Sequence, residues 1–253
     1  MSGFSYKVLL LMRYGIFSDV HSNLEAFRVV IDYYRKEKIN RYIFLGDIVG
    51  YCANPRETIA LLKTLHPVSL AGNHDWAVID KLDLEYFNFY AKKAILWTKN
   101  DLEEEDLNYL HTFKLIYQVD DFVCVHGSLK EPQKFNYIFD INDAWLNFFL
   151  FKEKICFVGH SHKKGVYFLD EKNRVFYLQD DAVKVEERGK YIINVGSVGQ
   201  PRDGDWRTCL CIYDSEEKIV RFKRLEYNVK KTVDKILNNK LPPLLAFRLY
   251  EGW

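Results

Sequence analysis

The chain has 253 residues, of which 36 are Lys or Arg and 35 are Asp or Glu, so the formal net charge is +1. This balance disfavours nucleic acid as the main partner, because no global field attracts a polyanion. Hydrophobic residues make up 48% of the chain, and no apolar run is long enough to cross a bilayer, so we expect no membrane association. The odd number of cysteines, 5 in all, favours a reducing compartment, and we predict a cytoplasmic protein.

Strands and helices alternate in the first part of the chain. The pattern predicts strands at 14–18, 41–45 and 68–71. Ser22 and Glu25 are predicted to form a capping box that starts the first helix, and Pro55 is predicted at the first position of the second helix. Such alternation predicts right-handed βαβ units and a parallel core, with ligands beyond the carboxyl ends of the strands.

The pattern changes in the second half of the chain, where hairpins dominate. Helices are predicted at 86–102, 104–110, 143–149 and 229–238, with Pro242 and Pro243 ending the last one, and strands at 114–118, 122–125, 155–158, 165–169, 175–178, 191–195, 208–213 and 219–226. No repeat or linker interrupts the chain, so we predict a single domain over residues 1–253. Residues 1–12 are interpreted as a possible N-terminal extension, with Met12 as an alternative start.

Polar residues of a particular kind follow five of the strand-like runs. They are Asp19-x-His21, Gly46-Asp47, Gly72-Asn73-His74-Asp75, Val125-His126-Gly127 and Gly159-His160-Ser161-His162. On an extended chain, Asp19 and His21 would point to the same side and could bind one cation. Oxygen and imidazole ligands without a thiolate suit divalent Mn, Fe, Co, Ni or Zn.

This series, in order and spacing, resembles the signature of the calcineurin-like metallophosphoesterase superfamily. The loop from Asn194 to Arg202 is similar to one found in its small, compact bacterial and archaeal phosphoesterases. Together with the strand pattern, the resemblance predicts an α/β (α+β) fold, a four-layer αββα sandwich of two mixed sheets flanked by helices.

The resemblance also implies a site that holds two divalent metal ions. The first ion would take Asp19, His21 and His162, the second would take Asn73, His126 and His160, and Asp47 would bridge both. Such a pair stabilises an in-line phosphoryl displacement, and a metal-activated hydroxide would be the nucleophile.

Two further residues of the site, His74 and Asp75, are predicted to be catalytic. By resemblance His74 would protonate the leaving group or stabilise the phosphoryl charge. The alternative is that His74 only supports the ligands and is held by Asp75.

One motif departs from the pattern of phosphoprotein phosphatases, which carry Gly-Asp-x-x-Asp-Arg-Gly at the second position. Here the stretch from Gly46 to Cys52 lacks both the second Asp and the Arg, which weakens a protein-phosphatase interpretation. Arg202 is a candidate phosphate ligand, because guanidinium matches phosphate oxygens, and the alternative is a surface arginine in a turn. Four aromatic residues are candidates for lining the pocket, with core packing as the alternative: Tyr51, Trp76, Tyr137 and Trp206.

The leading hypothesis is a dinuclear metal-dependent phosphoesterase that hydrolyses small phosphomonoesters, phosphodiesters or nucleotides. Its partner would be that small phosphate ester or nucleotide, and homo-oligomerisation stays open. The alternatives are a protein serine/threonine phosphatase, a diadenosine polyphosphate phosphatase and a non-catalytic metal-binding scaffold. A nuclease would need a basic groove or an added DNA-binding domain, and neither is visible.

Overall fold

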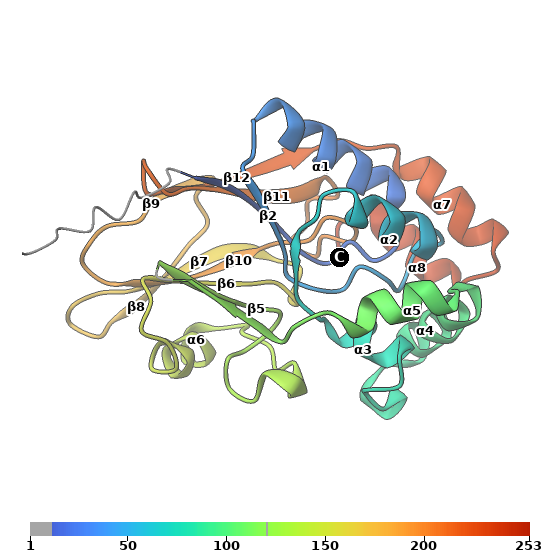
Figure 1. The fold of residues 1–253 in the computed structure, drawn as a ribbon, viewed down its shortest axis with the longest axis horizontal. Helices are drawn as coiled ribbons and strands as arrows, with labels where there is room; N and C mark the ends of the chain where they lie inside the picture. Colours follow the sequence, from blue (N-terminus) through green and yellow to red (C-terminus); the bar gives the residue numbers. More distant parts are fainter. Residues whose placement is uncertain (1–11, 120) are drawn as a thin grey trace, which may run out of the picture.

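The computed structural model describes residues 12–119 and 121–253, so the proposed extension lies almost entirely outside the described residues. Two six-stranded mixed sheets form its centre (Figure 1). Helices lie on the outer side of each sheet, with α1 (Leu24–Lys36) and α7 (Val229–Asn238) beyond one and α6 (Ile141–Phe148) beyond the other. The predicted αββα sandwich is therefore confirmed.

The first sheet has the order β3-β2-β1-β11-β12-β9. Its strands are β1 (Arg13–Phe17), β2 (Arg41–Phe44), β3 (Val68–Ser69), β9 (Ala182–Lys184), β11 (Thr208–Asp214) and β12 (Ile219–Leu225). Strands β1, β2 and β3 are parallel, whereas β11, β12 and β9 join by antiparallel pairing. The predicted parallel βαβ core thus occupies one half of this sheet.

The second sheet has the order β4-β5-β6-β10-β7-β8. Its strands are β4 (Ile116–Gln118), β5 (Phe122–Val125), β6 (Ile155–Val158), β7 (Lys164–Leu169), β8 (Val175–Leu178) and β10 (Lys190–Val195). Strand β6 pairs in parallel with β5 and β10, while the other neighbours are antiparallel. Both sheets are therefore mixed, as predicted.

Alternating side chains on the strands build the layers. In β1, Ile16 packs into a buried cluster between the sheets, whereas the next residue, Phe17, packs outward against α1. The inter-sheet cluster includes Ile43, Cys211 and Phe222 from one sheet and Phe122, Phe157 and Ile193 from the other. Strands that bury both faces read as continuous apolar runs, which is why their positions could be predicted.

The other helices are α2 (Pro55–Lys63), α3 (Asn73–Val78), α4 (Phe89–Asp101), α5 (Glu104–His111) and α8 (Pro243–Phe247). Short 3₁₀ turns occur at Leu84–Tyr86, Pro132–Lys134 and Arg248–Tyr250. The sequence did not predict α3, α8 or β9. Proline at the first position of α8 starts a helix, so Pro242-Pro243 is a junction between two helices rather than only a stop.

The prediction that Ser22 and Glu25 form a capping box at the start of α1 is wrong. Asn23, not Ser22, caps α1, and its side chain accepts a hydrogen bond from the Ala26 amide. Glu25 turns away from the helix end and accepts a hydrogen bond from Lys235 of α7 at 2.7 Å. Ser22 belongs to the preceding loop, where its backbone φ is 58°.

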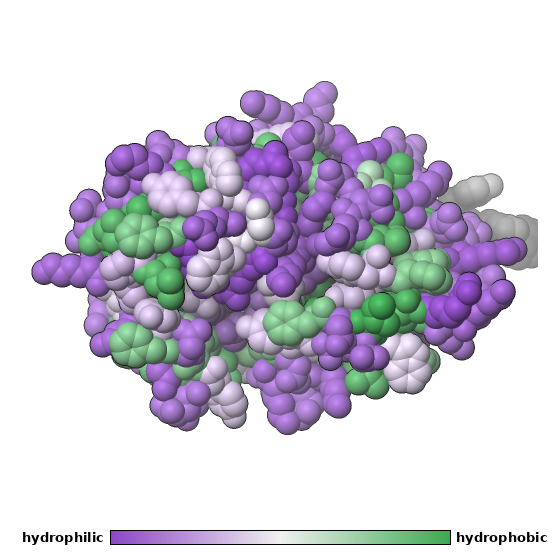
Figure 2. Space-filling model, turned by 180° about the vertical axis from the view of Figure 1, so that it is seen from behind, coloured by the Kyte–Doolittle hydropathy of each residue, from purple (hydrophilic) through white to green (hydrophobic). Residues whose placement is uncertain are grey.

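Apolar side chains are exposed on α6, among them Trp145, Leu146 and Phe149. Figure 2 shows apolar groups among polar ones at both ends of the face opposite to that of Figure 1. Homo-oligomerisation, which the sequence left open, stays a prediction. No helix within the described residues is both long and apolar enough to span a membrane.

Candidate metal centre

The predicted ligands lie in loops at one edge of the sandwich, each just after a strand. Asp19 and His21 follow β1, Asp47 follows β2, Asn73 begins α3 after β3, His126 follows β5, and His160 and His162 follow β6. This arrangement agrees with the rule that ligands collect beyond the carboxyl ends of parallel strands. All these histidines and aspartates are buried.

The backbone at this edge is unusual. Five of the seven predicted ligands have left-handed backbone, with φ between 48° and 64°: Asp19, His21, Asp47, His160 and His162. Such conformations cost about 1 to 3 kcal/mol each and cluster at functional sites. The Asp19-x-His21 segment is therefore not extended, as the sequence led us to expect, and two left-handed residues instead turn both side chains toward a common point.

Close approach of the loops explains the glycines that precede the ligands. A Cβ atom on Gly72 would overlap Oδ1 of Asp47, and one on Gly159 would overlap the Ser18 hydroxyl. Only glycine lets these loops pack this closely.

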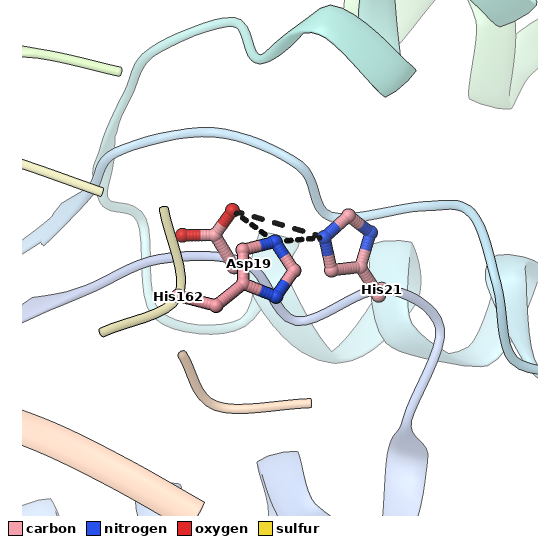
Figure 3. Close-up of side chains that lie close together, drawn as sticks. All are labelled: Asp19, His21 and His162. Atoms are coloured by element: carbon pink, nitrogen blue, oxygen red, sulfur yellow. Dashed lines mark hydrogen bonds and ion pairs between the residues drawn. The ribbon is translucent and has the colours of Figure 1, made fainter. Parts of the chain in front are cut away.

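The first group consists of Asp19, His21 and His162 (Figure 3). The Asp19 Oδ1 atom lies 3.7 Å from His21 Nε2 and 3.2 Å from His162 Nε2. The two Nε2 atoms are 3.1 Å apart. Three potential ligand atoms therefore converge on one point inside the protein.

Hydrogen bonds on the far side of the rings fix how these histidines present their nitrogens. His21 Nδ1 lies 3.0 Å from the Val49 carbonyl and His162 Nδ1 lies 2.6 Å from the Gln200 carbonyl. A carbonyl accepts, so each Nδ1 carries the proton and each Nε2 turns a lone pair inward, as in metal-binding histidines. Asp19 Oδ1 has no hydrogen-bond partner among the described residues. Two lone pairs and a carboxylate oxygen facing one another fit a cation.

The second group consists of Asp47, His126 and His160. Oδ2 of Asp47 lies 3.4 Å from His126 Nε2, and His126 Nε2 lies 3.1 Å from His160 Nδ1. The Leu45 carbonyl lies 2.9 Å from His126 Nδ1, which again directs the Nε2 lone pair inward. Asn73 lines the cavity beside His160, and its Oδ1 has no hydrogen-bond partner within the described part of the chain.

Asp47 lies between the two groups. The same Oδ2 atom that faces His126 is 3.6 Å from His21 Nε2, and Oδ1 accepts a hydrogen bond from the His74 amide at 2.8 Å. Burial opposes ionisation, but His126 and His74 outweigh it and hold the pKa of Asp47 below its usual range. In turn, although burial lowers the pKa of His126, Asp47 raises it to about 9. In the protein without metal, His126 therefore holds an extra proton at the position that a metal ion would take.

Asp75 supports the loop that carries Asp47. Its Oδ2 atom accepts hydrogen bonds from the amides of Asp47 at 2.7 Å and Gly72 at 3.0 Å, and Oδ1 accepts one from Ile48 at 2.9 Å. Burial and the charge of Asp47 raise the pKa of Asp75 to about 7. The structure thus gives Asp75 contacts with the backbone of this loop, and within the described residues it places no hydrogen bond between Asp75 and the His74 ring.

His74 lies beside the metal-ligand groups with an unpaired ring nitrogen. Its Nδ1 is buried and has no hydrogen-bond partner among the described residues. Gly50 packs closely against this ring, since a Cβ atom there would lie 2.5 Å from Nδ1. Gly50 occupies the position at which phosphoprotein phosphatases carry the second Asp of their motif. Burial, with smaller contributions from His21 and Arg202, lowers the pKa of His74 to about 3.

Arg202 reaches the same place from the loop after β10. Its guanidinium donates hydrogen bonds to Gln200 Oε1 at 2.9 Å and to the Tyr51 hydroxyl at 3.3 Å. Tyr51 stands where the motif of phosphoprotein phosphatases has its Arg. Arg202, from a loop distant in the sequence, therefore contacts Tyr51, the residue that replaces the motif arginine.

A small cavity of about 80 Å³, here called the polar cavity, opens onto these groups. Asp47, Asn73, His74, His160, His162 and Arg202 line it, together with Tyr51, Tyr86, Phe87, Asn88, Ala91 and Tyr137. Of the four aromatic candidates, Tyr51 and Tyr137 lie at the site, whereas Trp76 packs against Phe135 and Trp206 against Tyr227. Tyr86 and Phe87 were missed as site residues, because the sequence predicted them at the start of a helix, whereas they lie in and just after a 3₁₀ turn before α4.

The fold and the converging ligands are those of metal-dependent hydrolases built on an αββα sandwich. Residues 12–189 match the family profile described as calcineurin-like phosphoesterase. The chain belongs to the calcineurin-like phosphoesterase family, and it is therefore a metal-dependent phosphoric ester hydrolase.

Individual relatives are similar over nearly the whole chain. An uncharacterised protein of Methanocaldococcus jannaschii is 38% identical over 243 residues, which cover 94% of this chain and 97% of the relative. The crystal structure of a metallophosphoesterase from Sphaerobacter thermophilus is 38% identical, covers 96% of this chain and 100% of its own, and superposes with a TM-score of 0.83. A hypothetical protein of Pyrococcus horikoshii, 21% identical, shares the fold with a TM-score of 0.77 over 95% of this chain and 98% of its own.

Proposed function

We propose that this phosphoesterase binds two divalent ions side by side and hydrolyses small phosphate esters. The observation that carries the proposal is the position of Asp47, whose Oδ2 atom lies within 3.6 Å of His21 Nε2 and 3.4 Å of His126 Nε2. One carboxylate thus faces both groups of ligand atoms. Asp19, His21 and His162 would hold the first ion, Asn73, His126 and His160 the second, and Asp47 both.

The ions, when bound, supply the positive charge that polarises the phosphoryl group and activates the attacking water. The buried carbonyl partners of His21, His126 and His162 keep these rings oriented and favour the proton on Nδ1 in the neutral ring, so that Nε2 is the nitrogen available to a metal. No serine or cysteine nucleophile is required. The set of oxygen and imidazole ligands suits Mn, Fe, Co, Ni or Zn.

His74 and Arg202 are proposed to act on the phosphate itself. Both line the polar cavity beside Asp47. The guanidinium of Arg202 would donate to phosphate oxygens. The lowered pKa of His74, caused first by its burial, favours a neutral imidazole that donates a hydrogen bond to a phosphoryl oxygen rather than one that transfers a proton to the leaving group.

The lining of the site favours a small ester over a phosphoprotein. The polar cavity is only about 80 Å³, and the motif at Gly46 to Cys52 lacks the Asp and Arg of protein phosphatases. A purely structural role is not supported, because every predicted ligand is present and buried or turned toward the site. The identity of the metals, with manganese among the candidates, and the cytoplasmic location stay predictions.

A substrate screen tests the proposal. Purified protein is stripped of metal, reloaded separately with Mn, Fe, Co, Ni and Zn, and assayed on phosphomonoesters, phosphodiesters and pyrophosphate esters. We expect hydrolysis of small esters that depends on added metal and is lost in Asp47→Asn. Hydrolysis that persists after chelation, or no hydrolysis of any ester with any of these metals, would contradict it.

A further inference from the structure

A second, larger cavity opens directly beside the metal centre. Its volume is about 370 Å³, and two segments, residues 82–87 and 133–137, form its walls. We call it the aromatic cavity; its lining residues are Asn73, Leu82, Tyr86, Phe87, Gln133, Lys134, Phe135, Asn136, Tyr137 and His160. Five of these also line the polar cavity: Asn73, Tyr86, Phe87, Tyr137 and His160. A molecule whose phosphate lies at the metals therefore has its next available space here.

The rings that line the aromatic cavity differ in how much of their surface is free. Tyr137 stacks on His160 at a centroid distance of 3.8 Å and on Phe139 at 4.4 Å, so its faces are occupied within the protein. Phe87 meets the His74 ring edge to face at 5.2 Å. Tyr86 is 80% exposed, and no aromatic side chain among the described residues packs on it. Tyr86 thus offers a bare ring face at the rim of the cavity.

An exposed tyrosine face of this kind is costly in water and is used for stacking on flat ligands. The polar part of the lining suits such a ligand as well. Gln133 and Asn136 bring amide groups that can both donate and accept hydrogen bonds. Lys134 is already paired with Glu131 at 2.6 Å, so the cavity carries little free charge. A ligand that matches this lining has a flat surface and hydrogen-bonding groups at its edge. A heteroaromatic ring fits that description better than a sugar or an alkyl chain does.

We infer that the aromatic cavity binds a nucleobase, so that the esters hydrolysed at this site are nucleotides or nucleotide esters. The volume of about 370 Å³ lies within the range of about 300 to 1,000 Å³ typical of sites for small organic ligands. The inference rests on the proposed function, because it assigns to the hydrolytic site the organic part of its substrate.

Matched substrates isolate the contribution of the base. Adenosine 5′-monophosphate is compared with ribose 5-phosphate, and the methyl diester of the first with that of the second, so that each pair differs only in the adenine. We expect the adenine to raise kcat/KM by roughly 5- to 150-fold, the range for one base stacked on an aromatic side chain. Equal kcat/KM within whichever pair is hydrolysed would overturn the inference while leaving the proposed function intact.

Variants then locate the effect. Tyr86→Ala should bring the kcat/KM ratio between the paired substrates close to one, whereas Tyr86→Phe, which keeps the ring, should retain most of it. Phe89→Ala is the matched control, since Phe89 is also exposed, at 64%, but does not line the aromatic cavity. A ratio that is the same in Tyr86→Ala and in the wild type would place the base elsewhere and overturn the inference.

A binding measurement separates this inference from the proposed function. The purified protein with its metals is mixed with adenosine or with ribose, neither of which carries phosphate, and binding is followed by ligand-observed NMR. If adenosine binds, ribose does not, and Tyr86→Ala loses the binding, the nucleobase site is supported. This holds even if no ester is hydrolysed, and in that case only the proposed function fails. Absence of adenosine binding to the wild type would overturn the inference.

Discussion

The Asp75 carboxylate accepts a hydrogen bond from the backbone amide of Asp47 at 2.7 Å, although the two acidic residues are 28 positions apart in the chain. The same carboxylate also holds the amides of Ile48 and Gly72. It therefore joins the loop after β2 to the loop after β3, and these loops carry the ligands Asp47 and Asn73.

Replacement of Asp75 by Ala should weaken metal binding without removing any ligand. The buried amides that Asp75 holds would lose their acceptor, so we expect the free energy of unfolding to fall by about 2 to 5 kcal/mol. We also expect metal affinity to fall by roughly 10- to 100-fold. Denaturant titration and calorimetric metal titration measure the two effects. Asp170→Ala is the control, because Asp170 also accepts hydrogen bonds from amides, those of Lys172 and Arg174, in a remote hairpin. Unchanged metal affinity in Asp75→Ala would show that the loop keeps its shape without this carboxylate.

His74→Ala should lower kcat by roughly 10²- to 10³-fold, as for loss of a preorganised hydrogen-bond donor. If the neutral imidazole donates to a phosphoryl oxygen, the factor should be the same for a nitrophenyl ester and for an alkyl ester. The two ratios are measured at one pH and at matched metal loading, with His111→Ala on the exposed side of α5 as the control. A markedly larger ratio for the alkyl ester, which needs a proton on its leaving group, would instead identify His74 as a general acid.

Arg202→Ala should mainly raise KM, because the lost group binds the phosphate. Loss of a hydrogen bond to a charged group predicts an increase of roughly 10- to 150-fold. Arg202→Lys should recover only part of the loss, since an ammonium cannot make the two-pronged contact. Inhibition by inorganic phosphate provides an independent readout. Arg207→Ala, an exposed arginine of the same loop that is paired with Asp205, is the control, and equal KM values in the two variants would remove Arg202 from the site.

The metal-free protein should lose stability as the pH rises through about 9. Asp47 raises the pKa of His126 to about 9 in the folded state, against about 6.5 for a free histidine. The folded state therefore binds the extra proton, and this stabilisation is complete below about pH 6.5 and lost as the pH rises through the folded pKa. Thermal unfolding between pH 7.5 and 9.5 should show a decrease of several degrees that is absent in His126→Gln. A decrease of equal size in the variant would assign it to another group.

Much of this arrangement could be predicted from the sequence because the ligand motifs follow buried strands. Ile16 and Phe17 end an apolar run that only Ser18 separates from Asp19, and similar runs precede Asp47, His126 and His160. Parallel strands present their carboxyl ends at one edge of a sheet, so motifs that are distant in the sequence were expected to converge. The fold class and the family follow from the same pattern, and both are confirmed.

Other features depend on contacts that local sequence does not encode. Asn23 rather than Ser22 caps α1, because left-handed residues carry the loop past Ser22 before the helix begins. The helix α3 has only six residues, and its N-terminal amides are satisfied partly by Asp47 from another loop. Tyr86 lies in a short 3₁₀ turn, and only the tertiary fold places that turn beside His160.

Metal content in two variants tests how Asp47 and His126 divide their roles. Asp47→Asn should reduce bound metal at both positions, whereas His126→Ala should mainly empty the second. Elemental analysis after equilibration with Mn gives the ratio of metal to protein. Two retained metals and full activity in Asp47→Asn would remove the bridging role.

The most direct measurement of the central claim is anomalous X-ray scattering from crystals of the Mn-loaded wild-type protein. We predict two anomalous peaks about 3.5 to 4 Å apart, one among Asp19, His21 and His162 and the other among Asn73, His126 and His160, with the Asp47 carboxylate contacting both. A single fully occupied peak, or two peaks of which only one contacts Asp47, would contradict the two-metal centre proposed for this phosphoesterase.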